Sequence, residues 1–246
     1  MSVKICFIVG HGKSKSGGYD PGACANGAQE YRIAREIALA AQEHYNKNFV
    51  EQADIMNYEA DLYLTERIKK VNASNYDFVA EIHLNAGGGT GTETYYHKGS
   101  EIGKKYADEI SKEISKSLGI KQRANGTDDG GDKIKLNSAG KDYFAIIRET
   151  KPTAVLIETV FIDTPFDLSK VSTAEGQKTC GIAIAEAVAS VRKAERKKVV
   201  APVAPKPTEK KLYRVQVGAF SKRENAEAML DKLRDAGFED AFIKSE

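Results

Sequence analysis

The sequence has no long hydrophobic run, few cysteines and no strong excess of either charge. No apolar stretch in its 246 residues reaches the length of roughly 20 residues that a membrane-spanning helix needs. The N-terminus runs directly into a strand-like segment, without the charged leader, apolar core and small-residue cleavage site of a signal peptide. We therefore expect a protein that is made in the cytoplasm and has no part within a membrane.

The cysteines and the charges narrow the class further. Cys6, Cys24 and Cys180 are an odd set without paired spacing, which predicts reduced, mostly structural thiols. The formal net charge is +2, but residues 192–211 carry eight Lys or Arg against two Glu, so the remainder has 29 basic and 33 acidic residues. A body with a slight negative excess does not predict a nucleic-acid partner.

Helical and strand-like patterns alternate along the first three quarters of the chain. Short β-branched and aromatic runs cover residues 3–9, 76–82 and 153–157, and between them apolar residues recur at helical spacing. The helical positions are Ile33, Ile37 and Ala41, then Leu64, Ile68 and Val71, then Tyr106, Ile110, Ile114 and Leu118, and finally Ile184, Val188 and Val191. This alternation predicts an α/β fold, a mainly parallel twisted sheet with helices on both faces. A polar loop is expected over residues 125–132.

The composition changes after residue 191 and predicts two domains. Residues 192–211 are basic and contain three of the six prolines, which is typical of a linker. Residues 212–246 predict a small βαβ module with strands over 213–220 and 241–243, a helix over 225–236 and a stop at Gly237. A single βαβ unit of 35 residues is too small for a stable core of its own, so we expect it to need a partner.

Three polar residues stand at the ends of the strand-like runs. His11, His83 and Glu158 each lie at or just past such an end, where ligands bind in an open α/β sheet. Two imidazoles and one carboxylate with an open position suit catalytic zinc, and a second carboxylate would be needed as a base. Glu158 and Glu30, at the start of the first helix, are the two candidates.

Taken singly, these residues also have ordinary structural interpretations. His83 alone would more often be a hydrogen-bonded structural histidine, and Glu30 a solvated glutamate favoured by the helix dipole. Gly12-Lys13-Ser14 resembles the end of a phosphate-binding loop, but that motif needs glycine where Phe7 stands. Glu81 and Glu149 are interpreted as structural or rim residues, and His44 and His97 as surface histidines.

Five short motifs, taken in order, carry a resemblance to a known family. They are Gly10-His11-Gly12, Asp20-Pro21-Gly22-Ala23, Asn26-Gly27 followed by Glu30, Ile82-His83-Leu84-Asn85-Ala86 and Ala154-Val155-Leu156-Ile157-Glu158. Residues 3 to about 191 resemble the zinc-dependent N-acetylmuramoyl-L-alanine amidases of bacterial autolysins and phage endolysins, of the amidase-3 type.

The resemblance implies roles for six residues. It implies that His11, Glu30 and His83 bind one zinc ion and that Glu158 is the catalytic carboxylate. Asn85 and Glu93 match recurrent family positions and are predicted to bind substrate. The predicted domains are thus a zinc amidase over residues 1–191, a linker over 192–211 and a wall-binding module over 212–246.

The C-terminal module is similar to a sporulation-related (SPOR) repeat, which in that family binds the glycan strands of peptidoglycan. The likeness lies in Tyr213-Arg214-Val215-Gln216-Val217-Gly218-Ala219-Phe220 and Asn225-Ala226. The full module has two βαβ repeats and this chain has one. We therefore predict a homodimer in which two half modules complete one sheet.

The expected function is hydrolysis of peptidoglycan between N-acetylmuramic acid and L-alanine by zinc-activated water. Without a signal peptide, the enzyme would reach the wall only after the membrane is breached, as an autolysin or an endolysin. A zinc peptidoglycan carboxypeptidase and a non-catalytic wall-binding protein are the two alternatives.

Overall fold

The chain divides into two compact units. The computed structural model describes residues 4–123, 130–197 and 215–245. The contacts group Met1–Lys198 into one unit, called the body below, and Val199–Glu246 into a second. The two are described separately, because their relative position is not determined.

The body is built on a six-stranded, mostly parallel sheet. In spatial order its strands are β6 (Ala53–Met56), β1 (Ile5–Val9), β7 (Phe78–Asn85), β10 (Thr153–Phe161), β8 (Glu93–Tyr96) and β9 (Asp132–Lys133). The first four run parallel, β8 is antiparallel to β10, and β9 is parallel to β8. Two small hairpins pair β2 (Gly12–Lys13) with β3 (Tyr19–Asp20) and β4 (Cys24–Ala25) with β5 (Ala28–Gln29).

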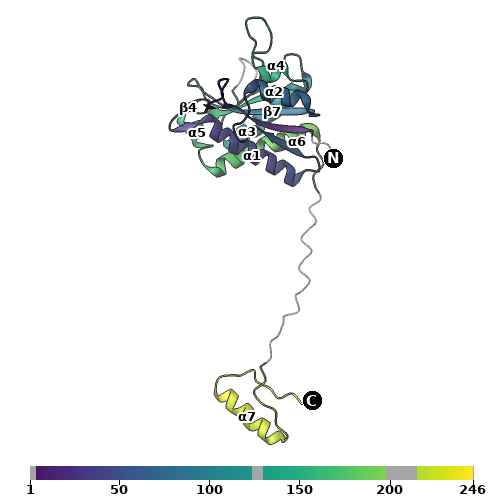
Figure 1. Cartoon of the computed structure of the whole chain (residues 1–246). Helices are drawn as coiled ribbons and strands as arrows, with labels where there is room; N and C mark the ends of the chain where they lie inside the picture. The colour runs from purple at the N-terminus through teal and green to yellow at the C-terminus, as the bar shows by residue number, and fades with distance from the viewer. Residues whose placement is uncertain (1–3, 124–129, 198–214, 246) are drawn as a thin grey trace. The chain divides into compact units, whose positions relative to one another are not determined.

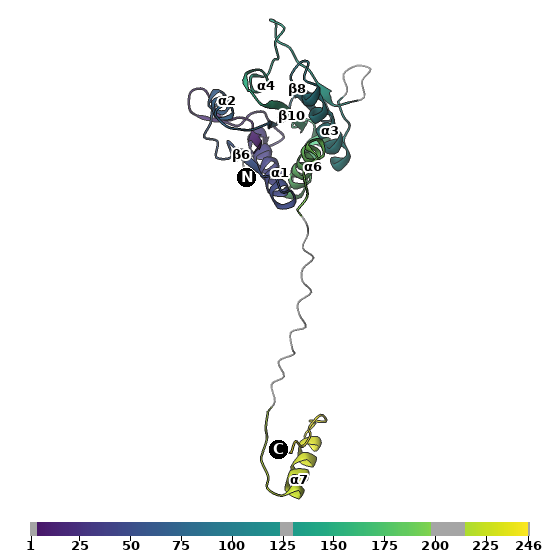
Figure 2. The same cartoon turned by 90° about the vertical axis from the view of Figure 1, so that its right-hand side faces the viewer.

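Helices cover both faces of this sheet, as predicted (Figures 1 and 2). One face carries α1 (Glu30–Asn48), α3 (Glu101–Leu118) and α6 (Ala174–Arg192), and the other carries α2 (Leu64–Ala73) and α4 (Ala145–Glu149). The short α5 (Pro165–Ser169) follows β10. Each face has its own apolar core, because alternate strand residues point to opposite sides.

The strands that carry the site are longer than predicted. β7 continues through His83 to Asn85, and β10 continues through Glu158 to Phe161. His83 and Glu158 therefore lie within strands, where the ladder fixes their backbone, rather than just past the strand ends. The predicted polar loop also ends earlier, since Asp132 is buried in β9, and residues 124–129 lie outside the described part of the chain.

The body also continues beyond the predicted boundary at residue 191. Arg192 pairs with Glu51, Glu195 O accepts from Val50 N at 2.8 Å, and Lys197 N donates to Asn48 O at 2.8 Å. The first residues of the predicted linker are thus attached to the end of α1.

In the described residues 215–245, the second unit contains one helix, α7 (Arg223–Asp235), close to the prediction. Gly237 follows it with φ +92°, a conformation that suits a helix stop. The predicted strands are wrong: the described residues 215–245 form no strand, and residues 213–214 lie outside them. A strand needs a partner to satisfy its backbone, and a single repeat supplies no sheet. Its apolar side chains remain exposed, for example Val215 at 88% and Phe242 at 68%.

The cysteines and the apolar character of the helices were both considered in the sequence, and the structure describes each of them. All three cysteines are free; Cys6 and Cys180 are buried, and Cys24 is exposed. Among the described residues, no helix combines the length and the apolar character that crossing a membrane requires.

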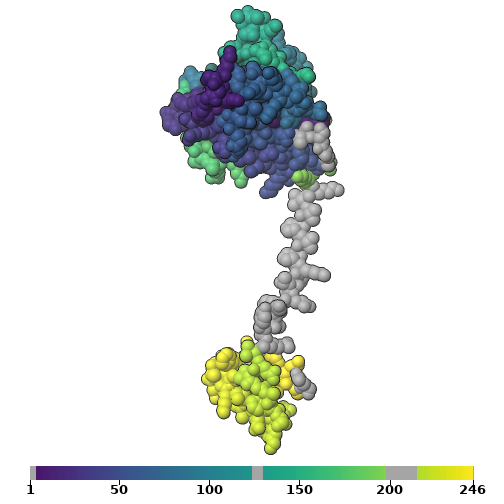
Figure 3. Space-filling view, viewed as in Figure 1, coloured from purple at the N-terminus to yellow at the C-terminus, as the bar shows by residue number. Residues whose placement is uncertain are grey.

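The segment between β9 and α4 projects from the body (Figure 3) and exposes Ile134, Leu136 and Tyr143.

The close packing of α6 on α1 generates the first prediction. A Cβ added at Gly181 would lie 2.5 Å from Ile37 O and 2.8 Å from Ala41 N. We expect Gly181→Val to lower the free energy of unfolding by about 1–3 kcal/mol, because the helices would have to separate. Urea denaturation followed by circular dichroism measures this. The control is Ser190→Val on the exposed face of α6; equal losses in the two variants would contradict the packing.

Candidate metal centre and active site

The loop that follows β1 presents the first imidazole. His11 has φ +59°, a conformation that few residues other than glycine adopt, and Gly12 after it has φ +87°. The side-chain amide of Asn57 holds this turn, because Nδ2 donates to Val9 O and to His11 O, each at 2.8 Å. The chain therefore leaves the strand sharply enough to turn the His11 ring toward the edge of the sheet.

Glu30 enters the site from the start of α1, and only 3% of it is exposed. Its carboxylate accepts from two backbone amides, Ala23 N at 2.8 Å and Leu84 N at 3.1 Å. A Cβ at Gly22 would lie 2.6 Å from Glu30 Oε2 and 2.7 Å from His11 Cδ2. The absence of a side chain at Gly22 therefore allows the loop to close over these two groups.

The second imidazole, His83, lies on β7 directly over Gly10. A Cβ at Gly10 would lie 2.3 Å from His83 Cε1, so a residue with a side chain would displace the ring. The rings of His11 and His83 meet edge to face, with centroids 4.9 Å apart. Both motif glycines in this part of the chain thus make room for the imidazoles and the carboxylate.

One ligand atom each from His11, Glu30 and His83 lie within 4.8 Å of one another. His11 Nε2 is 3.2 Å from Glu30 Oε2, and His83 Nδ1 is 2.8 Å from Glu30 Oε1. Asp20 Oδ2 lies 3.0 Å from the other nitrogen of His11, Nδ1. A carboxylate in that place favours the tautomer that leaves Nε2 free to bind a metal.

The contacts within this cluster shift the pKa values of its carboxylate and its two imidazoles. Burial alone would raise the pKa of Glu30, but hydrogen bonds from His11 and His83 hold it well below its ordinary value. Burial would lower the pKa of both histidines, but Glu30 raises them, that of His83 well above its ordinary value. The carboxylate of Glu30 thus favours positive charge on its two neighbours, and a divalent cation bound there could supply that charge.

Glu158 lies beside this cluster on the neighbouring strand. It is the register partner of His83 across the parallel pair of β10 and β7, so the two side chains share a face. Its Oε2 is buried and has no hydrogen-bond partner among the described residues. Burial raises the pKa of Glu158 from 4.5 to about 7. A carboxyl group with this pKa can gain or lose a proton near neutral pH.

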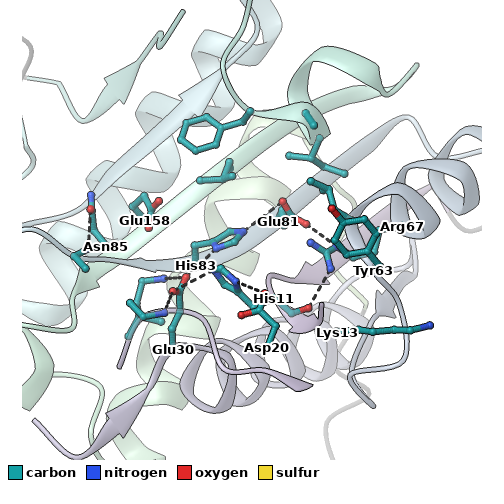
Figure 4. A pocket seen from close by; sticks show the side chains of 18 residues that line it. His11, Lys13, Asp20, Glu30, Tyr63, Arg67, Glu81, His83, Asn85 and Glu158 are labelled. Atoms are coloured by element: carbon teal, nitrogen blue, oxygen red, sulfur yellow. Dashed lines mark hydrogen bonds and ion pairs between the residues drawn. The ribbon is translucent and has the colours of Figure 1, made fainter. Parts of the chain in front are cut away.

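The four groups line one cavity of about 500 Å³ (Figure 4). Its polar side includes His11, Glu30, His83, Asn85 and Glu158, and side chains from the helical face, among them Leu64, Phe144 and Ile146, form an apolar wall. One side of the cavity is thus polar and suited to a cation, and the opposite side can contact the apolar parts of a substrate.

Of the two predicted substrate residues, only Asn85 lines the cavity. Glu93 is fully buried, and its carboxylate accepts from Asn85 Nδ2 at 2.5 Å, Tyr95 OH at 3.0 Å, Arg123 NH1 at 2.9 and 3.1 Å, and Lys133. These bonds engage both carboxylate oxygens, so Glu93 holds its neighbours in place. Of the two residues, Asn85 is the one that faces the cavity.

The sequence patterns give no role to three residues around the centre, Asp20, Arg67 and Glu81. Asp20 belongs to one of the motifs and bonds His11, and Arg67 belongs to none of them. Glu81, interpreted as structural, lies against both Arg67 and His83. An acidic residue two positions before a strand histidine shares its face, and this spacing is the signal that could have indicated Glu81.

The other histidines and Glu149 lie away from the centre. His97 is a surface residue as predicted, with 57% of its side chain exposed, and it pairs with Asp142. His44 is more buried than predicted, because 20% of its side chain is exposed and it bonds Glu186 at 2.6 Å. Glu149 is exposed and pairs with Arg148.

Comparisons with known proteins identify the family of this chain. A family model described as N-acetylmuramoyl-L-alanine amidase matches residues 5–190, and a SPOR domain model matches residues 184–246. The chain is 28% identical to the sporulation-specific N-acetylmuramoyl-L-alanine amidase of Bacillus subtilis (strain 168) and 31% identical to the N-acetylmuramoyl-L-alanine amidase CwlM of Bacillus licheniformis. Each alignment covers 98% of this chain and 84% of the relative.

A solved structure, Cwp6 from Clostridium difficile, has the same fold as the body. The superposition has a TM-score of 0.67 at 32% identity and covers 77% of this chain and 29% of that chain. The chain belongs to the N-acetylmuramoyl-L-alanine amidase family.

Proposed function

We propose that this protein hydrolyses peptidoglycan at the amide bond between N-acetylmuramic acid and L-alanine, with one zinc ion held by His11, Glu30 and His83. The observation that carries the proposal is the cluster of three ligand atoms within 4.8 Å beside the buried, unpaired oxygen of Glu158. The chemistry itself is that of the family to which the chain belongs.

The donor set fits zinc. Two imidazole nitrogens and one carboxylate oxygen are a common set at catalytic zinc sites, which keep a fourth position open. The glycines at positions 10 and 22 leave space for the three side chains and no more. Bound there, zinc would polarise the scissile carbonyl and lower the pKa of a water molecule toward neutrality.

Glu158 is the general base and then the general acid. Its buried oxygen has no hydrogen-bond partner within residues 4–123, 130–197 and 215–245, so it is available to accept the proton of the attacking water. Burial raises its pKa to about 7. A carboxyl group with this pKa can take up a proton from the water and then release it to the leaving amine. One carboxyl group can thereby serve both halves of the reaction.

Asn85 contacts the substrate, and Glu93 positions the side chain of Asn85. The side-chain amide of Asn85 has two N–H donors, and Glu93 Oε1 accepts from this amide. The second donor is free to bind a carbonyl of the substrate in the cavity. Glu93 in turn is held by Arg123 and Lys133, so the orientation of Asn85 is set from behind.

The C-terminal unit binds the wall and pairs with a second copy. Its SPOR match supports wall binding. Its exposed apolar side chains, Val215, Val217, Phe220, Phe242 and Ile243, lie in the two segments that would become strands if a partner supplied the rest of a sheet. A homodimer would provide that partner and would double the number of glycan contacts.

The bond that is cleaved distinguishes this proposal from its alternatives. Digestion of purified peptidoglycan should release new L-alanine amino termini, a chelator should abolish the release and added zinc should restore it. A zinc carboxypeptidase would instead free C-terminal amino acids, and a wall-binding protein without activity would release neither. Either of those outcomes would exclude the amidase assignment.

The role of Glu158 is tested by Glu158→Gln. We expect kcat/KM to fall by about 10²–10⁴-fold while zinc content is unchanged, because the amide cannot take up the proton. In the unmodified enzyme, activity should rise with pH as Glu158 ionises, with a midpoint between 4.5 and about 7, since a bound cation would lower the raised pKa. The control is Glu149→Gln at an exposed carboxylate. Full activity in Glu158→Gln would refute the role.

Self-association through the second unit is tested by light scattering. We expect the full chain to be a dimer and a chain ending at Lys198 to be a monomer. Cutting at residue 198 keeps the contacts that Arg192, Glu195 and Lys197 make with the body. If the full chain is a monomer at high concentration, the dimer proposal is wrong.

A further inference from the structure

A buried ion pair between Arg67 and Glu81 lies against both histidines of the centre. Arg67 and Glu81 are 4% and 2% exposed, and Arg67 Nε donates to Glu81 Oε1 at 2.9 Å. Neither residue belongs to the set that would hold zinc or act on the substrate. Burying two charges carries a desolvation cost, so the position of this ion pair beside the centre calls for an explanation.

The guanidinium of Arg67 connects α2 to the loop that carries the first imidazole. Its Nη1 donates to His11 O at 3.1 Å and to Leu62 O at 2.9 Å. Together with the bond from Nε to Glu81, these contacts engage two of the three guanidinium nitrogens. The side chain thus fixes the backbone of His11 relative to β7, which carries Glu81 and His83.

The second oxygen of Glu81 faces the other imidazole. Glu81 and His83 are two residues apart on β7, so their side chains point to the same face of the sheet. Glu81 Oε2 lies 3.4 Å from His83 Nε2, at ion-pair distance but without the geometry of a hydrogen bond. In the described part of the chain, His83 Nε2 is buried and has no hydrogen-bond partner.

The two nitrogens of His83 therefore face different groups. Nδ1 lies 2.8 Å from Glu30 Oε1, within the metal cluster, and Nε2 points toward Glu81, as Figure 4 shows. A neutral imidazole that binds a metal through Nδ1 carries its proton on Nε2, and a buried N–H without an acceptor is unfavourable. Glu81 is placed to accept this N–H.

We propose that Glu81 is a positioning residue that accepts the Nε2–H of His83 and so directs Nδ1 to the zinc ion, with Arg67 holding the Glu81 carboxylate in place. The proposal rests on zinc binding as set out under the proposed function. It assigns one ion pair to both imidazoles: Arg67 fixes the backbone of His11, and Glu81 fixes the tautomer and the ring orientation of His83.

A purely structural role would predict a different outcome. Replacing a buried ion pair by apolar residues of similar volume is often neutral or stabilising, so a pair kept only for stability can be replaced. Partners behind a metal-binding histidine typically contribute 10–100-fold to metal affinity. We therefore expect the double variant Arg67→Met/Glu81→Leu to fold and to bind zinc more weakly than the unmodified protein.

The first test reads the tautomer in the unmodified protein loaded with zinc. Long-range ¹H–¹⁵N correlation spectra distinguish a protonated imidazole nitrogen from a metal-bound one. We expect His83 to carry a proton on Nε2 and zinc on Nδ1. Zinc on Nε2 would overturn the proposal, and this test requires no variant to fold.

The second test compares zinc affinities by competition with a chelating indicator. Glu81→Gln should raise the Kd for zinc about 10–100-fold. The matched control is Glu51→Gln, which also removes a carboxylate from an arginine pair, Glu51 with Arg192, but at the far end of α1. The control should lower the Tm and leave the Kd unchanged. Equal Kd values in Glu81→Gln and the unmodified protein would refute the proposal.

Failure of this proposal and failure of the proposed function give different results. If the unmodified protein binds no zinc, the metal assignment itself is wrong. If it binds zinc and cleaves peptidoglycan, but His83 binds through Nε2 or Glu81→Gln binds zinc equally well, only the positioning role of Glu81 is wrong.

Discussion

The carboxylate of Glu30 is the group on which the geometry of the site depends. It accepts backbone bonds from Ala23 and Leu84 and contacts His11 Nε2 and His83 Nδ1. These partners belong to the loop before α1, to β7 and to the turn after β1. One buried charge at the start of a helix thereby joins three segments of the chain and sets the distance between the two imidazoles.

The same site separates two carboxyl groups by their surroundings. Glu30 is surrounded by donors, which hold its pKa low, whereas burial raises the pKa of Glu158, whose Oε2 has no hydrogen-bond partner in the described part of the chain. In the proposed function, this separation provides a charged ligand and a group that exchanges protons. Glu81, paired with Arg67, is a third carboxylate in a different environment beside an imidazole. The three glutamates thus differ in their partners, and the proposed roles follow from that difference.

The sequence indicated the sheet, its helices and the location of the site, but not all of its parts. Buried parallel strands have a strong apolar signature, and polar residues at their ends are conspicuous, which is why His11, His83 and Glu158 could be identified. Glu30 needed the family resemblance, because a first-turn glutamate is ordinarily a solvated residue. The role of Glu81 depends on a tertiary contact with Arg67, which no local pattern encodes.

The predicted strands of the C-terminal unit failed for a physical reason. Alternating apolar residues such as Val215 and Val217 have the pattern of a strand, but a strand forms only where another strand accepts its hydrogen bonds. The pattern describes what the segment could do in a complete sheet. In one copy of the chain that sheet is missing, and only α7 is formed there among the described residues.

The proposed function requires that His11, Glu30 and His83 form a single zinc site. X-ray absorption spectroscopy at the zinc edge of the loaded full chain tests this requirement. We expect one zinc ion per chain, bound by nitrogen and oxygen atoms only, with the scattering of two imidazole rings. A sulfur ligand, which would indicate binding at the exposed Cys24, or a site with fewer than two imidazoles, would contradict it.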